Sequence, residues 1–124
     1  MDHEALTAEM QALREQLAGI TDTAVAAIDG LLIEADTDDG IEVNGLAALA
    51  AATLGLAQRM AQATGRGTLR GTVAHGSRGC TAVYAVGDAA LLVVLGDEGL
   101  DLDRLDEECR PVLQRVDAIL TDKS

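Results

Sequence analysis

The chain is poor in aromatic side chains. Among its 124 residues there is no Phe and no Trp, and Tyr84 is the only aromatic residue. A core must therefore be built from Ala, Leu, Val and Ile, and nucleic-acid bases would find no aromatic platform for stacking. Basic residues are also scarce, since nine Lys and Arg face 21 Asp and Glu, for a formal net charge of −12. This balance argues against a nucleic-acid-binding protein and against adsorption to an anionic membrane surface.

Cysteine, histidine and long apolar runs are scarce as well. Cys80 and Cys109 are too far apart to define a disulfide framework, and with only His3 and His75 beside them a four-ligand zinc site is not expected. No stretch is apolar for long enough to span a bilayer. The N-terminal segment is acidic where a signal peptide would be basic. We therefore expect a cytoplasmic protein with reduced thiols, no metal and no cofactor.

The charge is unevenly distributed along the chain. Residues 65–96 hold three arginines against Asp88 alone, a net charge of +2, so the remainder carries −14. Acidic flanks around a weakly basic middle would steer a partner that presents basic patches.

Apolar residues at helical spacing mark both ends of the chain. The segment of about residues 2–18 predicts an amphipathic helix that ends at Gly19. The segment 102–120 shows the same spacing, and Pro111 within it predicts a kink or a break just before that residue. The repeating positions are Leu6, Met10, Leu13 and Leu17 in the first segment, and Leu102, Leu105, Cys109, Val112, Leu113, Val116 and Leu120 in the last.

Five short apolar runs indicate strands. Asp29-Gly30 separates the first two, and this pair is the strongest local signal for a β-hairpin because both residues tolerate positive φ. Short glycine-containing links join the other three, which must therefore pair antiparallel. The runs are Thr23–Ile28, Leu31–Ala35, Thr68–His75, Cys80–Val86 and Ala89–Leu95. The order helix-strand-strand-helix-strand-strand-strand-helix predicts an α+β sandwich. We expect a five-stranded antiparallel sheet with helices on both faces, in one domain over residues 1–124 with a core of about 20–116.

The middle helix is expected to begin at an Asn44 N-cap and to run to about Thr64, closed by Gly65. It carries no charge between Asn44 and Gln58, so a simple surface helix is not expected. Placing successive residues at 100° steps around the helix axis separates two faces. The wide apolar face, predicted to pack on the sheet, is Leu46, Leu49, Thr53, Leu56 and Met60. The opposite face of small residues is Ala47, Ala51 and Gly55, continuing into Gln58, Arg59 and Gln62.

Small residues along one ridge allow another helix to approach closely. This face either sits under another part of the same chain or meets a partner. The two terminal helices already have a sheet face to cover, so we predict that two copies pair through the middle helix around Ala51 and Gly55. The run Thr68–His75 is a second candidate, because its edge could join a second copy into one continuous sheet, whereas Arg70 could equally blunt that edge. The predicted dimer or partner interface is Ala47, Ala51, Leu54, Gly55, Gln58, Arg59, Gln62, Leu69 and Arg70.

No group of residues forms a catalytic pattern. The glycines of residues 65–71 lack the spacing of a phosphate-binding loop and precede a strand. Ser77 lies two residues from His75 without a nucleophile elbow, and Cys80 is interpreted as a small core residue rather than a nucleophile. The loop 36–40 has its glycine one place too early for an EF-hand and is interpreted as a solvated turn. We therefore do not expect an enzyme.

Three blocks resemble the roadblock (dynein light chain-like) family, and more closely its bacterial branch related to the gliding-motility GTPase regulators. The blocks are Thr23–Ala35 with its Asp-Gly turn, the Ala- and Leu-rich Leu46–Met60, and Val86–Leu95. The resemblance covers roughly Ile20 to Val116. It implies a homodimer with the middle helices side by side, and it implies binding to a small Ras-like GTPase. In that family, the face with Ala47, Ala51, Gly55 and Gln58 corresponds to the dimer and partner platform.

The resemblance leaves the mechanism open. A family member could insert an arginine into the nucleotide site, the candidates here being Arg59, Arg66, Arg70 and Arg78. We favour the alternative, in which the dimer clamps the switch loops of the GTPase. The rival function is a structural adaptor in a kinase or GTPase signalling complex. A small-molecule sensor is the least favoured, because the strands offer mostly Ala, Val and Leu.

Overall fold

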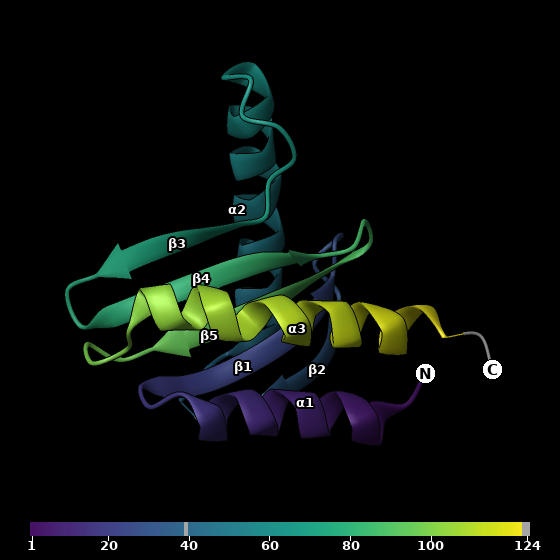
Figure 1. The fold of residues 1–124 in the computed structure, drawn as a ribbon, viewed down its shortest axis with the longest axis vertical. Helices are drawn as coiled ribbons and strands as arrows, with labels where there is room; N and C mark the ends of the chain where they lie inside the picture. Colours follow the sequence, from purple (N-terminus) through teal and green to yellow (C-terminus); the bar gives the residue numbers. More distant parts are fainter. Residues whose placement is uncertain (39, 123–124) are drawn as a thin grey trace.

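Three helices and five strands follow one another in the predicted order in the computed structural model, which describes residues 1–38 and 40–122. Figure 1 shows their arrangement. The elements are α1 (His3–Gln16), β1 (Ile20–Ala27), β2 (Leu32–Asp36), α2 (Val43–Ala63), β3 (Gly71–Gly76), β4 (Gly79–Val86), β5 (Ala90–Gly96) and α3 (Leu102–Thr121). In the described part of the chain, none of the helices combines the length and apolarity needed to cross a membrane.

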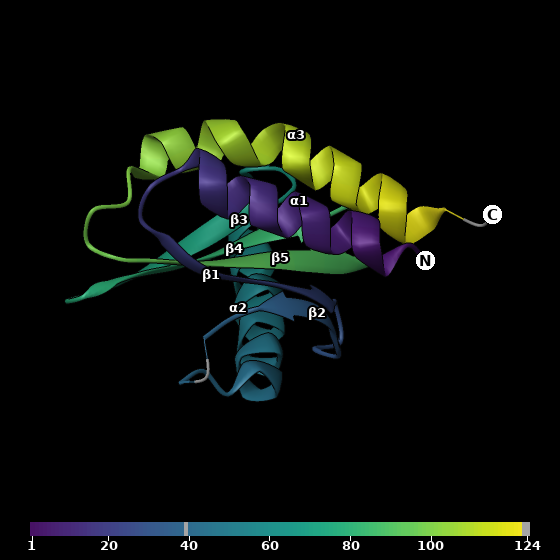
Figure 2. The same cartoon turned by 90° about the horizontal axis from the view of Figure 1, so that it is seen from below.

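The five strands form one sheet in the order β2-β1-β5-β4-β3, and every neighbouring pair is antiparallel. The predicted hairpin at Asp29-Gly30 is confirmed, and Gly30 has the positive φ of 95° that such a turn requires. Figure 2 shows α1 and α3 side by side on one face of the sheet and α2 on the other. The predicted α+β sandwich is therefore confirmed, with β2 and β3 as its two edges.

The layer between the sheet and the α1–α3 pair is the larger part of the core. It is built from aliphatic side chains of all three elements, as the lack of aromatics requires, and it includes the buried Cys109. Tyr84 enters this layer from β4 and donates its hydroxyl to Asp106 Oδ1 of α3 at 2.6 Å. On the outside, the Arg115 Nε of α3 donates to both carboxylate oxygens of Glu9 on α1, at 2.8 and 2.9 Å.

The second layer joins α2 to the sheet, and it contradicts one prediction. The face of α2 that packs on the strands is the small one, with Ala47, Ala50 and Leu54 buried, whereas Leu49 and Leu56 point away from the sheet. The opposing sheet surface already carries branched side chains, among them Val83, Leu91 and Val93. Because alanines are small, they let α2 lie close to that surface. The close helix makes more contacts with the sheet than a helix held further away by a row of leucines.

Several element boundaries also differ from the predictions. Glu42, not Asn44, is the N-cap of α2, and β3 begins at Gly71 rather than at residue 68. Of the two predicted alternatives at Pro111, a kink or a break, the break is wrong, because α3 runs through this residue as one helix. Pro111 and Glu107, whose carbonyl loses its hydrogen-bond donor, both lie on the exposed side of the helix, so water can replace the missing partner.

Candidate functional site

The outward face of α2 exposes large apolar side chains. Leu49, Leu56 and Met60 are 68%, 60% and 68% exposed, and Thr53 lies exposed between them. The hydroxyl of Thr53 donates to the Leu49 carbonyl at 2.8 Å. That bond turns the polar atom of Thr53 back onto the helix. These four residues form a continuous apolar stripe at helical spacing, called the apolar stripe below.

The stripe extends past the sheet. In Figure 1 the C-terminal turns of α2 project beyond β3, and the linker to β3 returns alongside them. The β1–β2 turn lies beside the other half of the helix, where a Cβ at Gly30 would come within 3.2 Å of the Ala48 Cα. This turn also exposes Ile28 and Leu31. Exposed apolar side chains gathered on one face are typical of a protein–protein interface.

The two ends of α2 carry opposite charge. At the N-terminus the Glu42 carboxylate accepts the backbone N–H of Gly45. At the C-terminus Gly65 has a φ of 67°, and the backbone N–H of Arg66 donates to the Ala61 carbonyl at 2.8 Å. Each charge complements the helix dipole at its own end. The segment 43–87 contains four arginines and no acidic residue, so α2 beyond its N-cap and the two strands that follow it contribute only positive charge.

The predicted interface residues fall into three groups by their burial. Ala47 and Leu54 are buried against the sheet, so their assignment to an exposed surface is wrong. Ala51, Gln58 and Leu69 are half-buried, and Ala51 and Leu69 pack against the α2 layer of the core. The members that are exposed on or beside α2 are Gly55, Arg59, Gln62 and Arg70. The four exposed residues flank the apolar stripe or lie at the start of the β3 edge.

Sequence reasoning identified the stripe but placed it on the wrong side of the helix. Both faces of α2 are apolar, and α2 has no charge before Arg59 to mark a solvent side. A signal was nevertheless available in the small residues of β1. Ala24 and Ala26 face α2 beside larger side chains of the sheet, and small residues at these positions let a helix approach closely through alanines of its own.

The thiols do not assemble a reactive centre. Cys109 is fully buried, and burial, with smaller contributions from Asp106 and Glu108, raises the pKa of its thiol to about 12. Cys80 is half-buried and lies opposite His75 in the β3–β4 pair. Among residues 1–38 and 40–122, no cluster of three His, Cys, Asp or Glu side chains is placed to share a metal ion.

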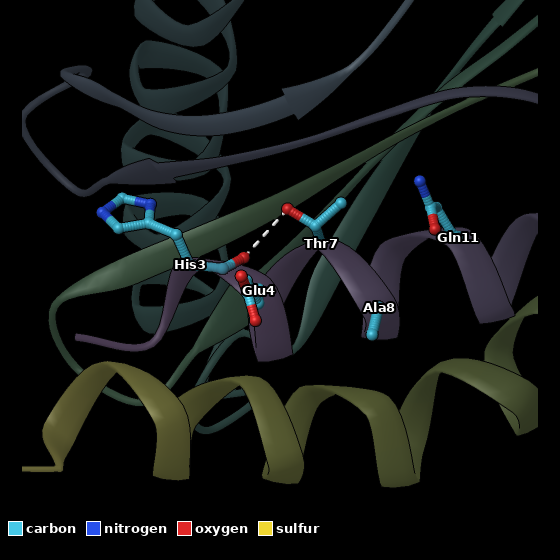
Figure 3. Close-up of a pocket in the computed structure, with 5 residues that line it drawn as sticks. All are labelled: His3, Glu4, Thr7, Ala8 and Gln11. Carbon is cyan, nitrogen blue, oxygen red and sulfur yellow. Dashed lines mark hydrogen bonds between the residues drawn. The ribbon is translucent and has the colours of Figure 1, made fainter.

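The hollows on the surface are shallow. One of about 300 Å³ lies on α1 and is lined by His3, Glu4, Thr7, Ala8 and Gln11. Figure 3 shows that these side chains come from one helix, and the Thr7 hydroxyl donates to the His3 carbonyl at 2.9 Å. A small-molecule site requires polar groups that converge on an enclosed apolar space, and this open hollow does not have that arrangement.

Comparison with known proteins places the chain in a family. The Roadblock/LC7 domain model matches residues 6–96. The uncharacterized protein MJ1340 of Methanocaldococcus jannaschii is 30% identical over 101 residues, which are 82% of this chain and 88% of that protein. The chain therefore belongs to the Roadblock/LC7 family, and the resemblance predicted from its three sequence blocks is confirmed.

Solved structures agree on the fold. A Roadblock/LC7 domain from Streptomyces avermitilis is similar with a TM-score of 0.85 at 23% identity, over 92% of this chain and 96% of that one. MglB of Myxococcus xanthus is similar with a TM-score of 0.87 at 17% identity, over 97% and 98%. The similarity covers nearly the whole chain and therefore includes the sheet and the helices on both of its faces.

Proposed function

We propose that this chain is a non-catalytic regulator that pairs with itself through α2 and binds a small Ras-like GTPase. The observation that carries the proposal is the apolar stripe, with its leucine and methionine side chains 60–68% exposed in a Roadblock/LC7 domain. Burying such side chains against a second copy would stabilise the pair by about 25 cal/mol for each Å² of apolar area removed from water. Family membership and the fold shared with MglB support the GTPase as the further partner.

The proposed mechanism is a clamp on the switch loops of the GTPase. Binding to one arrangement of these loops more tightly than to another shifts their population and so changes the rate of GTP hydrolysis. This requires a surface and no reactive group, which suits a chain whose thiols are buried or half-buried. The arginines Arg59, Arg66, Arg70 and Arg78 are all exposed, and they remain the residues through which an inserted guanidinium would act.

A capture and turnover experiment tests the function. The immobilised chain would be exposed to native lysate supplemented with a non-hydrolysable GTP analogue or with GDP, and a retained GTPase identified by mass spectrometry would then be purified. We expect retention to depend on the nucleotide, and single-turnover hydrolysis by the purified GTPase to change when the chain is added. Retention with unchanged hydrolysis would favour the structural adaptor. No nucleotide-dependent binding of any Ras-like GTPase would contradict the proposal.

Alanine variants of the four arginines separate the two mechanisms. A clamp predicts that binding and stimulated hydrolysis decline together, by modest factors, in each variant. An inserted arginine predicts that one variant retains binding and loses about 10³-fold or more of the stimulated rate. That second pattern would overturn the clamp while leaving the GTPase as partner.

A further inference from the structure

Strand β2 forms one edge of the sheet and has an outward backbone donor. In the described part of the chain, β2 has β1 on one side and no strand on the other. Neighbouring residues of an antiparallel strand direct their N–H groups alternately toward the paired strand and away from it. The Ala35 N–H donates to the carboxylate of Glu34 at 3.2 Å, and a side chain can reach this N–H only on the outer side of the strand. A strand added beside β2 would therefore find a donor in place.

The edge is only partly protected. Edge strands are commonly blunted by Lys or Pro, by short length or by bulges. β2 is short and has one register shift with β1, but it contains neither Lys nor Pro. Arg14 lies over its far end and pairs with Asp36 at 2.9 Å. At its near end Leu31 is 70% exposed. Between these ends the Glu34 carboxylate covers the Ala35 N–H.

That carboxylate is available to a partner. Its second oxygen lies 3.3 Å from the His3 ring, and both side chains are partly exposed. A carbonyl of an added strand can replace Glu34 at the Ala35 N–H, since strand addition joins main chain to main chain. The released carboxylate can then pair with a cationic side chain of the same added strand.

The charge around β2 has one sign. Residues 15–58 contain eight acidic residues and no Lys, Arg or His. Along β2, Glu34 and Asp36 alternate with Ala35, which packs against the α2 layer. A matching strand therefore alternates basic residues on the α1 side with apolar residues on the α2 side. A second copy of β2 would bring acids against acids, so the chain itself is a poor occupant of this edge.

We propose that the β2 edge accepts an extended segment of a partner protein as a sixth strand, with a basic side chain of that segment against Glu34. The main-chain contact is made at the Ala35 N–H, and a segment that continues past the start of β2 covers Leu31. The site lies at the edge opposite β3 and does not use the apolar stripe of α2. It is therefore independent of the proposed self-association.

A designed peptide tests the edge. The probe is fluorescein-labelled Val-Arg-Val-Arg-Val-Arg-Val, whose arginines all lie on one side when it is extended. One control peptide has the same composition with its three arginines adjacent. The other is the probe N-methylated at two adjacent central residues, which removes a donor from each of its edges. At about 0.15 M salt, we expect the probe to bind the full chain at least about tenfold more tightly than either control. Exchange of the Ala35 amide should slow at least about tenfold in the complex.

Substitutions in the chain locate the contact. Ala35→Pro removes the outward N–H and keeps the bonds to β1, so it should weaken probe binding about tenfold. Glu34→Lys should also weaken it about tenfold, by replacing attraction with repulsion. Glu107→Lys makes the same change of net charge at an exposed position on α3 and should leave binding unchanged. Leu56→Asp on the apolar stripe should leave it unchanged as well. Thermal unfolding checks that each variant is folded.

The outcomes decide between strand addition and attraction by charge alone. Equal binding of the probe and the control peptides, or an unchanged exchange rate of the Ala35 amide, would overturn the proposal. Weakening by Leu56→Asp as large as that by Glu34→Lys would overturn it too, by placing the peptide on α2. The N-methylated peptide asks the same question of the unaltered chain if Ala35→Pro does not fold. Tighter binding of the probe with a protected Ala35 amide supports the added strand.

Discussion

Leu54 and Leu56 lie two residues apart on opposite sides of α2, and truncating each to alanine should have opposite consequences. Leu54 is 4% exposed and packs against the sheet, whereas Leu56 is 60% exposed. Leu54→Ala leaves a cavity in the α2 layer and should lower the free energy of unfolding by about 3 kcal/mol. Leu56→Ala should lower the free energy of unfolding of the monomer by only about 0.5 kcal/mol.

The effect of Leu56→Ala should appear in association instead. The change removes three carbon groups worth about 0.8 kcal/mol each, and 60% of the side chain remains to be buried by a partner. This gives about 1.4 kcal/mol per copy, or about 3 kcal/mol for the symmetric pair, which corresponds to about a 100-fold rise in the dissociation constant. Urea unfolding at low concentration and sedimentation equilibrium measure the two quantities. A Leu56→Ala monomer destabilised as much as Leu54→Ala, or a dissociation constant within about threefold of wild type, would refute the assignment of Leu56 to an interface.

Three further predictions concern the α1–α3 side of the molecule. The pKa of the Cys109 thiol is raised from 9.0 to about 12 in the folded chain, so the unfolded chain loses this proton at a lower pH. The free energy of unfolding should therefore fall as the pH rises through that interval. Urea unfolding at a series of pH values measures this fall, which should be smaller in Cys109→Ala. Tyr84→Phe removes the hydroxyl that Asp106 accepts at 2.6 Å and should cost about 1 kcal/mol by urea unfolding, since the exposed Asp106 carboxylate stays hydrated. Gly19→Ala forces a side chain onto a φ of 103° and within 2.8 Å of the Leu100 Cα; it should cost about 2 kcal/mol or more and lower the melting temperature, and an unchanged melting temperature would show that this turn adapts.

Elements with one polar side were predictable from the sequence. In α1 and α3 the charged residues mark the solvent side, so the apolar spacing of Leu6, Met10 and Leu13 alone identified the buried face. The hairpins followed from local turn chemistry at Asp29-Gly30 and around Gly87, where φ is positive. These signals depend only on nearby residues, and the short links account for the β1–β2, β3–β4 and β4–β5 pairs. The β1–β5 pairing that joins the two groups of strands is a long-range contact that no local signal indicates.

The face of α2 was not predictable by the same means. Before Arg59 the helix offers no charge, so hydrophobicity alone favoured the leucine stripe as the buried side. The choice depends on the shape of the sheet surface, where Ala24 and Ala26 lie beside larger neighbours and accept a close helix. Pro111 shows the same limit, because its effect depends on whether the freed carbonyl of Glu107 meets water or protein.

The molar mass of the chain in solution shows directly whether two copies associate through the apolar stripe. Sedimentation equilibrium over a wide range of concentrations should show the wild-type chain approaching twice its 12.8 kDa mass. Under the same conditions a variant with Leu56→Asp should remain near the monomer mass while keeping its helical circular dichroism. A wild-type mass of 12.8 kDa at every concentration, or a Leu56→Asp variant that associates as tightly as wild type, would contradict the account.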